Sequence, residues 1–119
     1  MEYQVALTPR ARRDLANIWK YIAKDNPDAA TRFCHNLAQH AYSLQTFPER
    51  GHELHSRSNV WKVPSERYLI FYKILEEARQ VEILRFWHAA RDRRHLRLQE
   101  ETSGYSVAIT EEKVATVHA

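Results

Sequence analysis

The stretch from Val81 to His95, VEILRFWHAARDRRH, decides the fold of this chain. Its first half alternates like a β-strand, in which successive side chains point to opposite faces. The alternation places an arginine where a core residue is expected. One face is predicted to carry Val81, Ile83, Arg85 and Trp87, and the other Glu82, Leu84, Phe86 and His88.

The region from Arg85 to Arg97, which begins inside this stretch and ends two residues beyond it, is strongly basic. Asp92 is the only acid among its arginines, and His88 and His95 lie between them. Concentrated positive charge repels itself unless an anion or an acidic partner meets it, so the cluster is a candidate binding surface. The alternative is a solvated surface with no partner. The arginines are Arg85, Arg91, Arg93, Arg94 and Arg97.

The composition indicates one soluble domain. Of the 119 residues, 44% are hydrophobic, and no apolar run approaches the ~20 residues that span a bilayer. The first residues, MEYQVALTPR, lack the apolar core of a signal peptide, so we expect a cytoplasmic protein. Cys34 is the one cysteine, which excludes an internal disulfide and fits a reducing compartment.

Charge divides the chain into a basic domain and an acidic tail. Residues 1–98 carry a net charge of +6, and residues 99–119 carry −3. We expect residues 1–98 to form the single domain. We predict neither a structure nor a function for the tail, residues 99–119, from its sequence.

The N-terminal half predicts a short strand and a helical hairpin. Residues 2–8, EYQVALT, alternate, and Thr8-Pro9 is suited to cap and start a helix. Asn26-Pro27 ends this helix and starts a second, because the residue before proline leaves helical geometry. The apolar stripes are Ala11, Leu15, Ile18, Trp19 and Ile22 in the first helix, and Ala30, Phe33, Leu37, Ala41 and Leu44 in the second.

The second half predicts strands at 60–63, 68–75 and 81–88, joined by connections so short that the strands must be antiparallel. The polar segment 49–59 is expected to be a turn. The helical hairpin must cover one face of the sheet, because both apolar stripes need a partner. The predicted fold is therefore α+β: a short N-terminal strand, a helical hairpin and a three-stranded antiparallel meander, with the helices packed on one face.

The other face of the sheet is expected to stay partly open and to carry cations interleaved with aromatic rings. Such a surface suits nucleic acid, where cations meet phosphates and rings stack on bases. It suits an amphipathic peptide equally well, and half of the rings must belong to the core. The residues are Lys62, Arg67 and Arg85, with Tyr68, Tyr72 and Trp61 or Trp87.

Taken in order, these elements resemble the RelE/ParE superfamily of type II toxin–antitoxin toxins. The resemblance covers residues 3–98 and leaves the tail unmatched. It is carried by ARRDLANIWKYIAKDNPDAATRF across the helices, FPERG after them, SERYLIFYKI in the middle strand and VEILRFWHAARD at the end. The sequence of these segments is closer to the ParE, or plasmid-stabilisation, branch than to the RelE branch.

The resemblance implies a growth-inhibiting toxin that is neutralised by an antitoxin from a neighbouring gene. Several ParE-like members poison DNA gyrase. RelE-like members cleave messenger RNA in the ribosome, and need a base, an acid and cations around the scissile phosphate. The gyrase interpretation is favoured, because RelE-like enzymes commonly carry a tyrosine near the end of the last strand. Here that region reads FWHAARD and has no tyrosine, and the nearest one after it, Tyr105, lies in the tail. The alternatives are a ribosome-dependent mRNA endoribonuclease and a toxin fold without toxicity.

Two motif residues carry alternative interpretations. Arg85 would contact phosphate or an acidic surface, or else form an ion pair with Glu82, Glu66 or Asp92. His88 would be a general acid or a structural histidine, because residues three apart on a strand face opposite ways unless the strand bulges. If the chain is a ribonuclease, the resemblance makes Arg85, His88 and Arg67 the catalytic residues, with Glu66 as a candidate base.

The remaining expectations concern partners. The resemblance implies contact with gyrase or the ribosome, no membrane, and at most indirect contact with nucleic acid. Neither a cofactor nor a metal is expected, because two glycines cannot make a phosphate-cradling loop and no His or Cys set has metal spacing. The predicted binding surface is Lys62, Arg67, Arg85, Trp87, His88, Arg91, Arg93 and Arg94, and the predicted antitoxin contacts are Trp19, Arg85 and Arg91.

Overall fold

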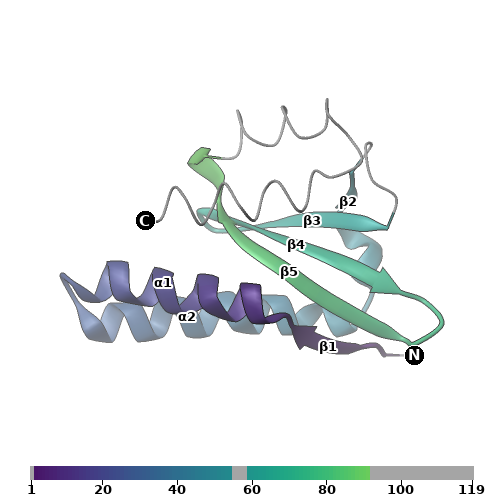
Figure 1. Ribbon diagram of the computed structural model, residues 1–119, viewed down its shortest axis with the longest axis horizontal. Helices are drawn as coiled ribbons and strands as arrows, with labels where there is room; N and C mark the ends of the chain where they lie inside the picture. Colours follow the sequence, from purple (N-terminus) through teal and green to yellow (C-terminus); the bar gives the residue numbers. More distant parts are fainter. Residues whose placement is uncertain (1, 55–58, 92–119) are drawn as a thin grey trace.

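A five-stranded sheet packs against two helices (Figure 1). The structure, a computed structural model, describes residues 2–54 and 59–91. Both helices lie on one side of the sheet, whose strand order is β1-β5-β4-β3-β2. This arrangement confirms the predicted α+β fold. The helices are α1 (Pro9–Ala23) and α2 (Pro27–Tyr42), and the strands are β1 (Gln4–Leu7), β2 (His52–Glu53), β3 (Val60–Ser65), β4 (Tyr68–Leu75) and β5 (Gln80–His88).

The start of the chain is fixed to its last strand. Strand β1 is an edge strand parallel to β5, with Val5 opposite Val81. Thr8 then caps helix α1, because its hydroxyl accepts a hydrogen bond from the amide of Ala11 at 3.2 Å. The same hydroxyl donates to the carbonyl of Ile83 at 2.8 Å. One side chain thus starts the helix and ties it to β5.

The helical hairpin has the predicted turn chemistry. The side chain of Asn26 accepts from the amide of Ala29 at 3.0 Å, and Pro27 begins helix α2. The inner faces of both helices pack on the sheet, where burial of apolar surface stabilises the fold. The main core comprises Tyr3, Leu7, Ala11, Ile18, Leu37, Ala41, Leu44, Val63, Ile70, Tyr72, Ile74, Val81, Ile83 and Phe86.

Strand β5 contains a β-bulge that the sequence analysis did not predict. Its pairing with β4 shifts between Phe71, which lies opposite Arg85, and Tyr72, which lies opposite Ile83. Leu84 is therefore an extra residue on β5 with no partner of its own on β4.

The bulge exchanges the faces of the strand beyond it. Val81 and Ile83 pack in the main core, and Phe86 joins them there. Leu84 and Trp87 belong instead to a second apolar cluster. The prediction that Trp87 shares a face with Val81 and Ile83 was therefore wrong, because an uninterrupted period of two does not allow for the extra residue.

The segment after α2 is more ordered than the expected turn. Two short 3-10 helices, η1 (Ser43–Gln45) and η2 (Pro48–Arg50), lead into β2, which pairs with β3. Gly51 lies so close to the hydroxyl of Tyr72 and the carbonyl of Lys62 that a Cβ atom would collide with both. The Tyr72 hydroxyl donates to the carbonyl of Pro48 at 2.7 Å and so anchors this segment to β4.

Candidate functional site

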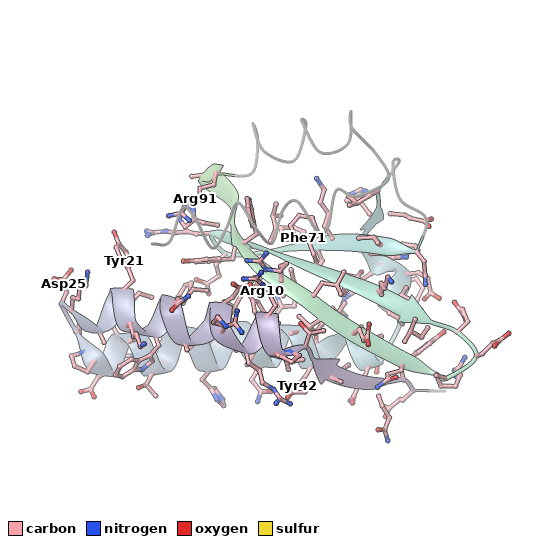
Figure 2. All side chains as sticks on the ribbon, viewed as in Figure 1. Arg10, Tyr21, Asp25, Tyr42, Phe71 and Arg91 are labelled. Atoms are coloured by element: carbon pink, nitrogen blue, oxygen red, sulfur yellow. The ribbon has the colours of Figure 1, made fainter. Side chains whose placement is uncertain are left out.

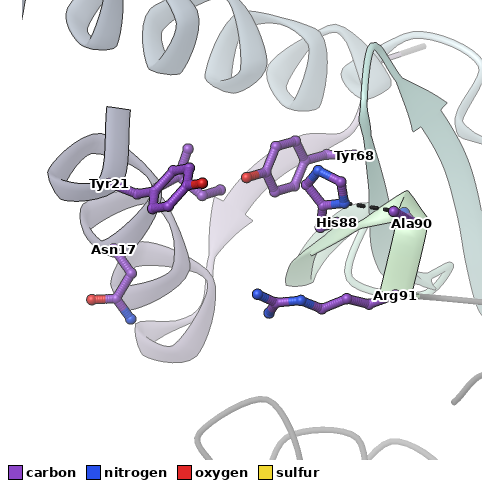
Figure 3. A pocket seen from close by; sticks show the side chains of 7 residues that line it. Asn17, Tyr21, Tyr68, His88, Ala90 and Arg91 are labelled. Carbon is purple, nitrogen blue, oxygen red and sulfur yellow. Dashed lines mark hydrogen bonds between the residues drawn. The ribbon is translucent and has the colours of Figure 1, made fainter. Parts of the chain in front are cut away.

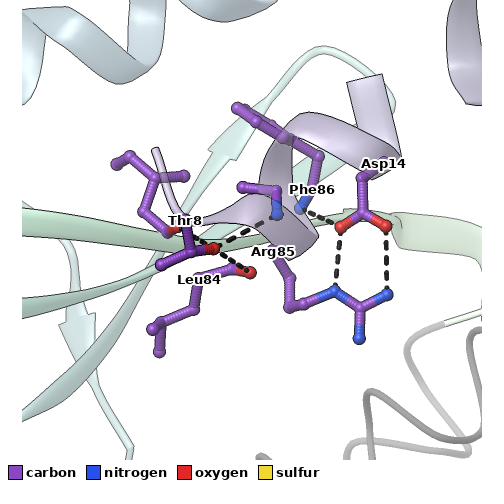
Figure 4. Close-up of polar contacts among 7 residues, drawn as sticks. Thr8, Asp14, Leu84, Arg85 and Phe86 are labelled. Atoms are coloured by element: carbon purple, nitrogen blue, oxygen red, sulfur yellow. Dashed lines mark hydrogen bonds and ion pairs between the residues drawn. The ribbon is translucent and has the colours of Figure 1, made fainter. Parts of the chain in front are cut away.

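Arg85, which was expected on an open face, is buried against helix α1 (Figure 4). Its side chain is 1% exposed and that of Asp14 is 4% exposed. The Nε atom of Arg85 donates to Oδ2 of Asp14 at 2.8 Å, and Nη2 donates to Oδ1 at 3.1 Å. This two-point pairing holds the guanidinium in one orientation. Asp14 is not among the acids proposed from the sequence as partners of Arg85, which are Glu82, Glu66 and Asp92.

Asp14 also accepts a hydrogen bond from the backbone of β5 at the edge of the sheet. Strand β1 ends at Leu7, so the amide of Phe86 on β5 needs an acceptor from another element. That amide donates to Oδ2 of Asp14 at 3.0 Å (Figure 4). The carboxylate therefore takes the place of a strand partner where helix α1 replaces β1 along the edge of β5.

The charge of Arg85 is neutralised inside the protein. Its guanidinium carbon also lies 5.7 Å from the ring centre of Trp87, within the range of a cation–π contact. The Nη1 atom is buried, and no acceptor lies within hydrogen-bond distance of it among the described residues. Arg85 thus holds α1 to β5 and presents little surface to a partner.

A concave surface lies between helix α1 and the ends of β4 and β5. We name it the α1–β5 groove. It consists of two cavities, of about 300 and 360 Å³, that share the side chains of Tyr21, Tyr68 and His88. The first is also lined by Asn17, Ile18, Ala90 and Arg91, and the second by Ile22, Ala29, Phe33, Glu66 and Arg67.

Two tyrosines face each other across this groove. Their hydroxyl groups point toward one another from helix α1 and strand β4 (Figure 3). Tyr21 is 72% exposed and stands on the side of the helix that faces Arg91 at the end of β5 (Figure 2). Tyr68 is half-buried, and its ring lies 5.8 Å from that of Phe33 on α2. The groove therefore offers an aromatic surface with polar ends, a composition common in recognition sites.

His88 lies against Tyr68 in the groove and is held in one orientation. Its Nδ1 accepts a hydrogen bond from the amide of Ala90 at 3.1 Å, which leaves the proton of the neutral ring on Nε2 (Figure 3). Its ring meets the edge of Tyr68 at 5.0 Å between centroids. Burial, and then the positive charges of Arg91 and Arg67, hold the pKa of His88 below its ordinary value.

The β3–β4 turn brings a carboxylate and a cation to the same groove. Glu66 has a φ of 58°, a left-handed conformation that lets the strand reverse within two residues. The carbonyl of Arg67 accepts from the amide of Ala89 at 2.7 Å, which joins this turn to the end of β5. The groove therefore collects Glu66, Arg67 and His88 from elements that are distant in sequence.

The other predicted site residues are scattered. Lys62 lies in β3 and does not line the groove, whereas Arg91 forms part of its wall. Trp87 is 3% exposed and belongs to the second apolar cluster. Trp19 is 39% exposed, and its indole donates to the hydroxyl of Thr31 at 3.1 Å. Arg93 and Arg94, together with Asp92, Arg97 and the tail, lie outside the described residues.

Sequence reasoning missed Asp14 and Tyr21. Asp14 has a recognisable signal, because it is an acid on the buried side of α1, three residues after Ala11 and four before Ile18. Nothing in the sequence around Tyr21 marks it as a groove residue. It lines the groove only because the end of β5 lies beside helix α1, and the local sequence of the helix does not predict that position.

Among residues 2–54 and 59–91, no set of three or more His, Cys, Asp or Glu side chains is arranged to hold a metal ion. None of the helices in the described part of the chain has the length and apolar character needed to cross a membrane.

Comparison with known proteins relates this fold to toxins. The family model of the ParE toxin of type II toxin–antitoxin systems matches residues 5–93. A proposed toxin of Sinorhizobium fredii, Y4kP, is 36% identical over 87 residues, which cover 72% of this chain and 88% of that protein.

Two solved toxin–antitoxin systems share the fold. A chain of the RelBE2 complex of Mycobacterium tuberculosis has a TM-score of 0.57 and 29% identity, covering 74% of this chain and 99% of its own. A chain of the chromosomal ParDE system of P. aeruginosa has a TM-score of 0.63, with 73% of this chain and 96% of that chain covered. The second likeness, at 16% identity, concerns the fold alone.

The helical hairpin on one face of a sheet whose last strand pairs with the first defines a RelE/ParE-like toxin fold. The family match extends from β1 to beyond β5, which is most of the chain. The chain therefore belongs to the ParE toxin family of type II toxin–antitoxin systems, which confirms the resemblance seen in the sequence.

Proposed function

We propose that this chain inhibits bacterial growth by poisoning DNA gyrase, without cleaving RNA, and that an antitoxin from a neighbouring gene neutralises it. The observation that carries the proposal is the burial of Arg85 against Asp14. A ribonuclease of this superfamily would need that arginine at the scissile phosphate. A guanidinium that is already neutralised and 1% exposed is poorly suited to that task.

The state of His88 supports the same conclusion. A general acid works best when its pKa lies near the pH of the reaction. The pKa of His88 is held below its ordinary value by burial and by two arginines, so the ring is mostly neutral in the cytoplasm, where gyrase and ribosomes both lie. A neutral imidazole is a weak proton donor to the leaving oxygen of an RNA strand.

The surface that remains for gyrase and for the antitoxin is basic and aromatic. At the groove it comprises Arg67, Tyr21 and Arg91. Lys62 and Trp19 lie apart from the groove, and Arg93 and Arg94 remain proposed contacts that lie outside the described residues. Arg85 contributes indirectly, because it fixes strand β5, which ends at His88 and leads into Arg91. Association over such a surface would favour acidic partners.

A second candidate is a ribosome-dependent mRNA endoribonuclease. It is favoured by the groove, where Glu66, Arg67 and His88 surround one cavity and offer a base, a cation and a proton donor. In that case Tyr68, which lies against His88, takes the place of the tyrosine that is missing from the end of the last strand.

Pulse labelling of DNA and protein synthesis, in the minutes after this chain is induced alone, separates the two candidates. Gyrase poisoning predicts that DNA synthesis stops first and that the DNA-damage response is induced. The same order of events is expected for His88→Ala, with His35→Ala, an exposed histidine of α2, as the matched control. Early loss of translation that disappears in His88→Ala would overturn the gyrase proposal in favour of the ribonuclease.

A further inference from the structure

The wall of the α1–β5 groove is also the place where the described chain ends. Arg91, the last described residue, lines the groove together with Tyr21 and Tyr68. Whatever follows it in the sequence starts within reach of these rings. The groove is open, and its exposed surface is mostly apolar.

The rim of the groove is positively charged. Arg67 and Arg91 both act on His88, and they come from two different segments, the β3–β4 turn and the residues that follow β5. Among the residues that line the two cavities, Glu66 is the only acid. A segment that combines apolar side chains with carboxylates would match this groove, because the apolar side chains can pack on its lining and the carboxylates can pair with its arginines.

The tail has that chemistry. Residues 99–119 contain four glutamates against Lys113 as the single base. In their middle, Tyr105, Val107 and Ile109 alternate with the small residues Ser106 and Ala108, so an extended segment has its large apolar side chains on one face. The acids stand on both sides of this segment, at Glu100, Glu101, Glu111 and Glu112.

The geometry of the chain permits the tail to return to the groove. Residues 92–98 connect Arg91 to the tail, and an extended chain gains about 3.3 Å per residue, so the connection reaches about 20 Å. A segment tethered this closely has an effective concentration in the millimolar range, which favours the intramolecular contact over a free partner.

We propose that residues 99–119 occupy the α1–β5 groove of their own chain, with the Tyr105–Ile109 face on Tyr21 and Tyr68 and the glutamates toward Arg67 and Arg91. The tail is then a built-in competitor for the surface that an acidic partner would use. This goes beyond the proposed function, because it holds whether the target is gyrase or the ribosome.

Paramagnetic broadening in the purified full-length chain tests this contact. A nitroxide is attached at Ser106→Cys in a Cys34→Ala background, which keeps Tyr105, Val107 and Ile109, and amide signals are compared with those of the reduced label. We expect Tyr21 and Ala29, which line the groove but are distant in sequence, to lose most of their intensity. Signals at Asn59 and Glu77, beside the β4–β5 turn, should be unchanged.

The electrostatic part has its own test. Glu100→Gln, Glu101→Gln, Glu111→Gln and Glu112→Gln together keep the length of the tail and should restore most of the lost intensity. Raising the ionic strength to about 1 M, where the Debye length is about 3 Å, should do the same without any further substitution.

Two results would overturn the proposal. One is that the label broadens no groove signal, or broadens another surface more strongly. The other is that the groove signals ignore the label yet shift when an antitoxin peptide is added, which would make the partner the sole occupant. Neither result depends on toxicity, so failure of this proposal is distinguishable from failure of the proposed function.

Discussion

Asp14 and Arg85, 71 positions apart in the chain, are joined by two hydrogen bonds inside the protein. Oδ2 of the carboxylate also accepts from the amide of Phe86. The pair therefore couples helix α1 to the strand whose end forms the groove. Its loss should affect stability first and the placement of His88 and Arg91 second.

Asp14→Ala should lower the free energy of unfolding by about 3 to 5 kcal/mol, because it leaves a buried guanidinium without its counter-ion. Chemical denaturation measures the change. Asp28→Ala, which removes an exposed acid from the first turn of α2, is the control and should cost far less. The double change Asp14→Leu with Arg85→Met should recover part of the loss, because it removes both buried charges but leaves the amide of Phe86 without its acceptor. A loss in the double variant equal to that in Asp14→Ala would contradict the ion-pair explanation.

Gly51→Ala should be destabilising by about 1 to 3 kcal/mol, as expected for overpacking of a tight contact. The new Cβ would meet the hydroxyl of Tyr72 and, at 2.5 Å, the carbonyl of Lys62. Adding Tyr72→Phe removes the first collision but not the second, so the double variant should stay less stable than Tyr72→Phe alone. Thermal melts of the four proteins would show this, and equal melting temperatures for the two Tyr72→Phe proteins would count against it.

Stability should fall in strong alkali through Tyr72. Burial raises the pKa of this phenol to about 12, compared with 10.0 in an unfolded chain. The folded state therefore holds the proton more tightly, and the stabilisation is present below pH 10 and lost as the pH rises toward 12. Tyr72→Phe should flatten the slope of unfolding free energy over this window. Part of the slope should remain, because burial also raises the pKa of Tyr68.

His88 should respond to the charges at the rim of the groove. Its pKa is held below 6.5 by burial and by Arg91 and Arg67, so its contribution to stability is present above pH 6.5 and is lost as the pH falls through the folded-state pKa. Arg91→Gln and Arg67→Gln should each raise that pKa, with the larger rise for Arg91→Gln. An NMR titration of the ring measures it. Arg12→Gln, on the exposed side of α1, should leave it unchanged.

Local chemistry made most of the fold predictable. Thr8-Pro9 and Asn26-Pro27 mark the helix starts in the sequence and cap them in the structure. The apolar middle strand was correctly placed in the interior, as β4 between β5 and β3. What the sequence concealed was non-local: the bulge at Leu84, which depends on the register of two strands, and the parallel pairing of β1 with β5.

The candidate site was less predictable for the same reason. His88, Arg67 and Arg91 were identified and do meet at one groove. Arg85 was expected beside them, yet a single acid on α1 takes it into the interior. A sequence motif shows which residues are present. Whether a charged side chain is exposed to a partner or paired inside the protein depends on its burial, which the motif does not show.

The pairing of the first strand with the last sets the order of events during synthesis. The ribosome makes β1 and α1 first, yet their partner β5 emerges only after some 75 further residues, the separation of Thr8 and Ile83. Contacts this distant must close a long loop and form late. A nascent chain interrupted before Val81 has no strand for β1 and no Arg85 for Asp14, so it leaves the ribosome unable to fold and exposed to proteases. The toxin fold therefore forms only after β5 has been synthesised and can join the sheet.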